Sequence, residues 1–114
     1  MRLTIDTSQP VNLREHLEGA VDDRSKILPA AVNAEAYVKR LLSRTIIYQE
    51  QVLKDLDYDF VQQLELGDPH DLALAMIIAE VDDIKQNREG NPQTATQILE
   101  DVRVSLSDRY CSDW

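Results

Sequence analysis

Three alternating aspartates, Asp55, Asp57 and Asp59, have the spacing of the first calcium ligands in an EF-hand loop. That loop also needs a glycine at its sixth position for a sharp turn and a bidentate glutamate at its twelfth. Phe60 and Leu66 occupy these two positions. The sequence therefore predicts no calcium site here, and helix capping explains the aspartates better.

Carboxylates one helical turn apart are a second candidate, because such pairs can hold a magnesium ion. Glu80 with Asp83, and Glu65 with Asp68, have a spacing similar to part of the metal site of all-helical nucleotide pyrophosphohydrolases. The Glu-x-x-Glu half of that site is missing, and Pro69 starts a new helix inside the second pair. We expect no metal cofactor at these carboxylates.

The other reactive residue types are too few or too isolated to build a catalytic site. His70 precedes Asp71, but His16 is the only other histidine, so a full set of metal ligands cannot be assembled. Cys111 is the single cysteine and has no histidine near it in the sequence. With three glycines, the chain has no phosphate-cradling loop. We predict a protein that is not an enzyme and that has no cofactor.

Charge is divided between two consecutive segments. Residues 55–84 carry nine carboxylates and no Lys or Arg, whereas residues 24–54 carry six cations and two glutamates. Opposite charges on two segments can pair within one chain, or they can face different neighbours and favour head-to-tail assembly. The alternative interpretation is that both segments are solvated helix surfaces whose charges fell unevenly.

Composition narrows the class of protein further. A net charge of −9 argues against sequence-specific nucleic-acid binding, which requires clustered cations. No apolar run is long enough to span a membrane, and residues 1–5 are too short and polar for a signal peptide. One cysteine suits a reducing compartment. We expect a soluble cytoplasmic domain of 114 residues.

Hydrophobic periodicity predicts an all-α fold, a small bundle of four to five helices forming one domain over residues 1–114. Residues 1–11 are predicted as an N-terminal arm that is either a short strand or extended chain, and residues 110–114 as a C-terminal tail. The expected helices run over residues 12–19, from a start between 25 and 33 to about 56, over 57–67, over 69–90 and from 92 or 95 to about 110.

Helix boundaries are predicted from capping residues. Asn12 and Glu15 have the spacing of a capping box, and Gly19 is expected to end that helix. Asp68 before Pro69 marks the start of the most apolar helix, which we expect at the centre of the bundle. The last helix begins at residues 91–92 or is capped by Thr94 with Gln97. Pro29 is expected only in the first turn of the second helix.

Two apolar residues lie on otherwise polar helix faces, Ile47 beside Arg40 and Arg44, and Val104 in the last helix. An apolar residue among cations is typical of an interface anchor. We expect subunits to associate through Arg40 and Arg44 of one copy and acidic residues of the next. The full set of expected interface residues is Arg40, Arg44, Ile47, Glu80, Asp82, Asp83, Arg88, Tyr110 and Trp114.

The order of these signals resembles the head-to-tail connector, or adaptor, proteins of long-tailed double-stranded DNA phages. Residues 12–17 (NLREHL) look like the first helix of that family, and an acidic loop at Asp22 and Asp23 follows. Residues 27–46 are similar to its second helix, which runs through an alanine-rich turn to a basic residue. Residues 68–79 (DPHDLALAMIIA), with Asn87, Arg88 and Glu89, look like its proline-started apolar helix. The predicted helix over residues 49–66 departs from the strand-like connection usual in the family.

The resemblance implies a non-enzymatic virion protein, a homo-oligomeric ring that joins the portal of the phage head to the tail. Its partners would be further copies, the portal and tail-completion proteins. It would be made in the host bacterial cytoplasm and end in the virion. The alternative hypothesis is a small acidic inhibitor or immunity protein that covers a basic protein partner and remains monomeric or dimeric.

Overall fold

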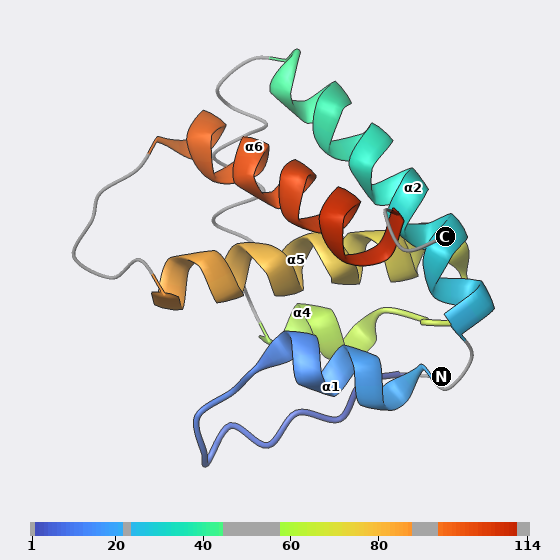
Figure 1. Ribbon diagram of the computed structural model, residues 1–114. Coiled ribbons are helices and arrows are strands. Elements are labelled where there is room, and N and C mark those ends of the chain that lie inside the picture. Colours follow the sequence, from blue (N-terminus) through green and yellow to red (C-terminus); the bar gives the residue numbers. More distant parts are fainter. Residues whose placement is uncertain (1, 22–23, 45–57, 88–93, 112–114) are drawn as a thin grey trace.

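All regular secondary structure in the described residues is helical. The computed structural model describes residues 2–21, 24–44, 58–87 and 94–111 (Figure 1). Its elements are α1 (Leu13–Ala20), α2 (Arg24–Leu42), α4 (Tyr58–Gln63), α5 (Pro69–Asn87), α6 (Ala95–Leu106) and the π-helical turn η1 (Ser107–Cys111). The prediction of a small all-α bundle is confirmed.

Helix α5 is the centre of the bundle, as its apolar sequence predicted. It packs against α1, α2 and α6, while α2 and α6 also pack against each other (Figure 1). The side chains of α5 are buried on nearly every side from Leu72 to Ile84. Two of these buried residues, Glu80 and Asp82, were predicted at an interface with another copy, and their environment is described below.

The local helix-start signals are confirmed. Asn12 Oδ1 accepts a hydrogen bond from the Glu15 backbone N–H at 3.2 Å. Thr94 Oγ1 accepts one from the Gln97 N–H at 3.1 Å and caps α6. Pro69 is the first residue of α5, directly after Asp68. Both bonds join groups three residues apart, so the sequence spacing alone specifies them.

Two boundary predictions were wrong. Helix α1 continues through Gly19 to Ala20, and its cap is Val21 in an extended conformation. Helix α2 begins at Arg24, which places Pro29 beyond its first turn. The same helix buries Ala30, Ala31 and other apolar residues in the core, and this packing outweighs the poor helix propensity of proline.

The N-terminal arm has no strand over residues 2–11, the described part of the arm, and residues 7–9 form a turn. Leu3 and Ile5 are buried in the core, and the Ile5 N–H donates to Gln62 Oε1 of α4 at 3.4 Å. The arm is therefore attached to the bundle. Polar and apolar residues alternate at the start of the arm, so that Leu3 and Ile5 lie on one side of the chain and pack on the core. This alternation does not reflect pairing with another strand among the described residues.

At the other end of the chain, Tyr110 was predicted to start an interacting tail. In the structure it lies in η1, which packs against α2 and α6, and its side chain is buried. Ile47, Arg88 and Trp114 lie outside the described residues, as does the predicted helical segment from residue 49 to 57. The described part of the next predicted helix is α4, which ends at Gln63 rather than at Gly67.

Candidate functional site

Two of the cationic residues predicted for an interface, Arg40 and Arg44, lie near the C-terminal end of α2. Both are exposed there, as is the neighbouring Lys39. Lys39 forms an ion pair with Glu35 of the same helix at 3.7 Å. The Arg40 guanidinium instead stands over the ring of Tyr37, 5.4 Å from its centroid. Because residues three apart share one helix face, the sequence of α2 itself places this cation on an aromatic ring.

A groove lies between this part of α2 and the start of α5. Its volume is about 370 Å³. The Tyr37 ring meets the His70 ring edge to face, with centroids 5.9 Å apart and planes at 88°. A smaller hollow of about 150 Å³ adjoins it and shares Tyr37 and Arg40 with the groove. The lining residues of the groove are Asn33, Ala36, Tyr37, Arg40, Asp68, Pro69, His70, Ala73 and Leu74.

The start of α5 is held in place by its own capping residues, and this fixes one wall of the groove. Asp68 Oδ1 accepts a hydrogen bond from the His70 N–H at 2.8 Å. Asp71 Oδ2 accepts one from the Glu65 N–H at 3.0 Å, so the preceding turn is tied to the helix. His70 therefore sits on a rigid helix start. In the sequence, His70 was considered only as a possible metal ligand, and a full set of ligands could not be assembled around it.

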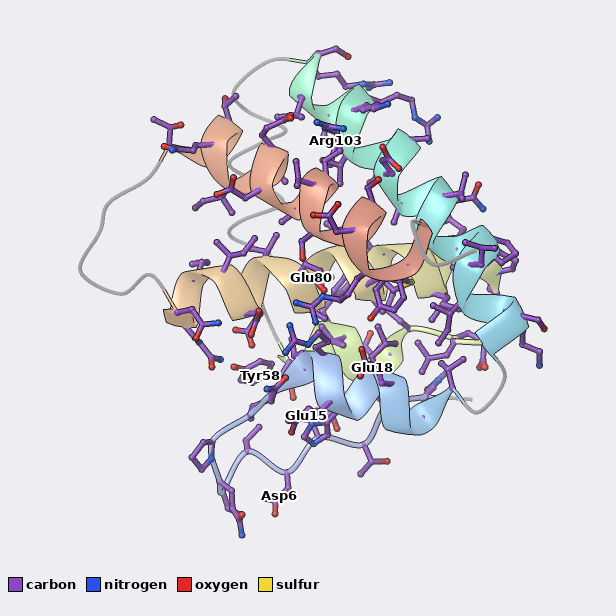
Figure 2. The ribbon with its side chains drawn as sticks, in the orientation of Figure 1. Asp6, Glu15, Glu18, Tyr58, Glu80 and Arg103 are labelled. Carbon is purple, nitrogen blue, oxygen red and sulfur yellow. The ribbon has the colours of Figure 1, made fainter. Side chains whose placement is uncertain are left out.

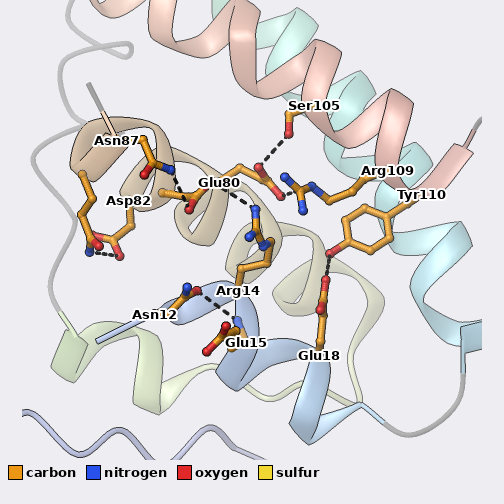
Figure 3. Close-up of polar contacts among 12 residues, drawn as sticks. Asn12, Arg14, Glu15, Glu18, Glu80, Asp82, Asn87, Ser105, Arg109 and Tyr110 are labelled. Carbon is orange, nitrogen blue, oxygen red and sulfur yellow. Dashed lines mark hydrogen bonds and ion pairs between the residues drawn. The ribbon is translucent and has the colours of Figure 1, made fainter. Parts of the chain in front are cut away.

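The acidic residues predicted to meet Arg40 and Arg44 of another copy are engaged within the subunit. Glu80 is only 1% exposed. Its Oε2 accepts a hydrogen bond from Ser105 Oγ at 2.8 Å, and its Oε1 lies 3.3 Å from Arg109 Nε (Figure 3). Burial raises the pKa of Glu80 above its ordinary value, and the contacts with Ser105 and Arg109 act in the opposite direction. The prediction that Glu80 lies at a subunit interface was wrong, because α5 turns it toward α6.

Asp82 and Asp83 differ from each other but are also used inside the chain. Asp82 is buried and accepts a hydrogen bond from Gln86 Nε2 at 2.9 Å, and burial raises its pKa. Asp83 Oδ2 forms an ion pair with Arg14 Nη1 of α1 at 3.1 Å. The predicted contact of Asp82 with a neighbouring subunit was therefore also wrong. Asp83 is half-buried and already paired, so it is a poor acceptor for an additional cation.

Tyr110 completes this internal polar network. Its hydroxyl donates to Glu18 Oε1 of α1 at 2.9 Å (Figure 3). Burial, together with the Glu18 carboxylate, raises the pKa of Tyr110. Glu80, Asp83 and Tyr110 thus connect α5, α1 and η1, and they stabilise the packing of the bundle rather than an exposed site. The prediction of Tyr110 as an interface residue was wrong for this reason.

The described residues contain no group of three or more His, Cys, Asp or Glu side chains placed to hold a metal ion. His16, the second histidine, contacts the Asn12 carbonyl oxygen through Nδ1 at 2.8 Å. No helix in the described ranges has the length and apolar character needed to cross a membrane.

Comparisons of the chain with protein-family models, curated proteins and solved structures found no match. The groove between α2 and α5 therefore has to be interpreted from its own geometry. Its lining combines two ring side chains, Tyr37 and His70, with the cation of Arg40 and the carboxylate of Asp68, next to small apolar residues.

Proposed function

We propose that this chain is a non-enzymatic assembly protein whose copies associate head to tail through the C-terminal end of α2. The observation that carries the proposal is Arg40 at the groove, stacked on Tyr37 and without a carboxylate partner among the described residues, in a chain of net charge −9. A cation in this setting is a ready acceptor for acidic surface, and every further copy of the chain supplies such surface.

Acidic side chains other than the predicted ones are available for this contact. Asp6 and Glu15 lie at one end of the molecule, whereas the C-terminal end of α2 lies at the opposite end (Figure 2). Both carboxylates are exposed, and Glu15 has no ion-pair partner among the described residues. Two different surfaces of one chain that attract each other make a heterologous contact, which closes into a ring or extends as a filament.

As part of this proposal, the assembly is the one that the resemblance to phage head-to-tail connectors implies. The chain would form a homo-oligomeric ring in the virion, between the portal and tail-completion proteins. Binding of membranes and of specific nucleic-acid sequences has no part in it. The burial of Glu80 and Asp82 supports a structural rather than a catalytic use of the carboxylates in α5.

Sedimentation velocity over a wide range of protein and salt concentrations tests the proposal, together with negative-stain imaging. We expect large species at low salt that dissociate at high salt with unchanged helicity, because exposed charges are screened over about 10 Å at 0.1 M salt. Arg40→Glu should reduce assembly. Lys26→Glu is the matched control, because Lys26 is equally exposed at the other end of α2.

A monomer at every protein and salt concentration would overturn the assembly proposal. Such a monomer that formed a salt-sensitive complex with a basic protein would instead support the acidic inhibitor.

A further inference from the structure

Three large apolar side chains of the described residues are exposed, and one is aromatic. Val32 is 51% exposed, Val104 43% and Phe60 38%. Helix α4 explains the position of Phe60, because the same short helix buries Val61, and the following turn buries Leu64. Phe60, next to Val61, keeps 38% of its surface exposed. Exposed aromatic residues are enriched at the centres of protein interfaces, where they supply much of the binding energy.

The groove between α2 and α5 fits an aromatic ring. Protein cavities on the order of 150 Å³ hold a benzene molecule, and the groove has about 370 Å³. Ala36, Ala73 and Leu74 provide small apolar surface, and Tyr37 and Arg40 provide ring-edge and cation–π contacts. Phe60 is not one of the lining residues, so the groove is not filled by the Phe60 of its own chain.

The charges around these two surfaces are complementary. Helix α4 is bonded to the N-terminal arm through Gln62 and Ile5, and the arm carries Asp6. Asp6 and Glu15 lie together at this end of the molecule (Figure 2). The groove is bordered by Arg40 and continues into the hollow that Arg44 lines. An aromatic residue from the end that carries Asp6 and Glu15 therefore meets a groove bordered by Arg40, whose lining also includes Asp68, the cap of α5.

We infer that Phe60 of one copy enters the groove between α2 and α5 of the next copy, with Asp6 and Glu15 opposite Arg40 and Arg44. The inference rests on the proposed head-to-tail assembly and names the contact that forms it. The ring of Phe60 supplies the apolar anchor. The charges orient the encounter and make it sensitive to salt.

The first experiment compares variants by sedimentation velocity and by circular dichroism. Phe60→Ser should weaken association at least tenfold while the monomer keeps its helicity, because 38% of Phe60 is exposed and open to a partner. Phe60→Tyr keeps the ring and should assemble like wild type. Val104→Ser removes an equally exposed apolar residue on α6 and should have no effect on assembly.

The second experiment mixes Arg40→Glu with Phe60→Ser at a protein concentration at which each variant alone is monomeric and wild type assembles. The first variant keeps Phe60 and the second keeps an intact groove, so exactly one functional contact remains. We expect a one-to-one heterodimer and no larger species, because neither outer surface of the pair can bind a further copy.

The outcomes separate this inference from the proposed function. If wild type assembles and Phe60→Ser assembles equally well, the inference is overturned while the assembly proposal stands. A mixture of the two variants that remains monomeric also overturns it, since Phe60 and the groove then do not meet. A wild type that is monomeric under all conditions removes the assembly proposal and this inference with it.

Discussion

Removing the hydroxyl of Ser105 is the most direct test of the buried carboxylate in the centre of the bundle. Ser105→Ala takes away the donor that bonds Glu80 Oε2 at 2.8 Å, while the other oxygen keeps Arg109 Nε at 3.3 Å. Glu80 is almost completely buried, so its carboxylate depends on donors from the neighbouring elements. The variant therefore leaves one oxygen of a buried acid without its donor.

The expected loss of unfolding free energy is about 1.5–3 kcal/mol, the range for hydrogen bonds to charged groups. A chain of 114 residues has an unfolding entropy of roughly 240 cal/mol/K near its melting temperature, so that 1 kcal/mol corresponds to about 4 °C. The melting temperature should thus fall by roughly 6–12 °C. Circular dichroism with heat and with urea, between about pH 4 and pH 8, measures both quantities across the titration range of glutamate.

The loss should grow as pH rises. The hydrogen bond from Ser105 favours ionised Glu80, so its removal raises the pKa of Glu80 further and penalises the charged form. Ser43→Ala is the matched control, because the exposed Ser43 hydroxyl bonds the Arg40 carbonyl oxygen of its own helix, and its loss should stay within about 0.5 kcal/mol. A Ser105→Ala variant as stable as this control at neutral pH would refute the assigned role of the hydroxyl.

Four further changes test other parts of the molecule. Glu80→Gln should flatten the pH profile of stability measured in urea, because the raised pKa of Glu80 gives wild type a contribution that is present below about pH 4.5 and lost as pH rises through the folded pKa. Tyr110→Phe should lower stability by about 1 kcal/mol, or roughly 4 °C, in a thermal melt, since it removes the hydrogen bond to Glu18. Asp68→Ala should cost about 1 kcal/mol in urea unfolding through the lost cap of α5, with little effect expected from the exposed control Ser8→Ala. Ile47→Asp should abolish assembly in sedimentation without changing the melting temperature, and a monomer that melts several degrees lower would place Ile47 in the core.

The helix caps and the faces of single helices could be predicted from the sequence alone. The caps at Asn12, Asp68 and Thr94 depend on side chains and N–H groups two or three residues away, so no other part of the chain is needed to specify them. Helix periodicity likewise placed Val104 on a polar face of the last helix, and Val104 is exposed on α6. Tyr37 and Arg40 share a face by helix periodicity, so half of the groove could have been found from spacing alone.

Whether each polar residue is buried or exposed depends on the packing of the whole chain. The periodicity of α5 placed Glu80 and Asp82 on a polar face, but α5 is enclosed by α1, α2 and α6, so no face of its central part is left for water. Whether a carboxylate is buried then depends on donors from elsewhere in the chain, such as Ser105, which lies 25 positions away in the sequence. The second wall of the groove, with His70, depends in the same way on how α5 packs across α2. Helix periodicity describes the surroundings of one helix in isolation, whereas burial and ion pairing are set by neighbours distant in the sequence.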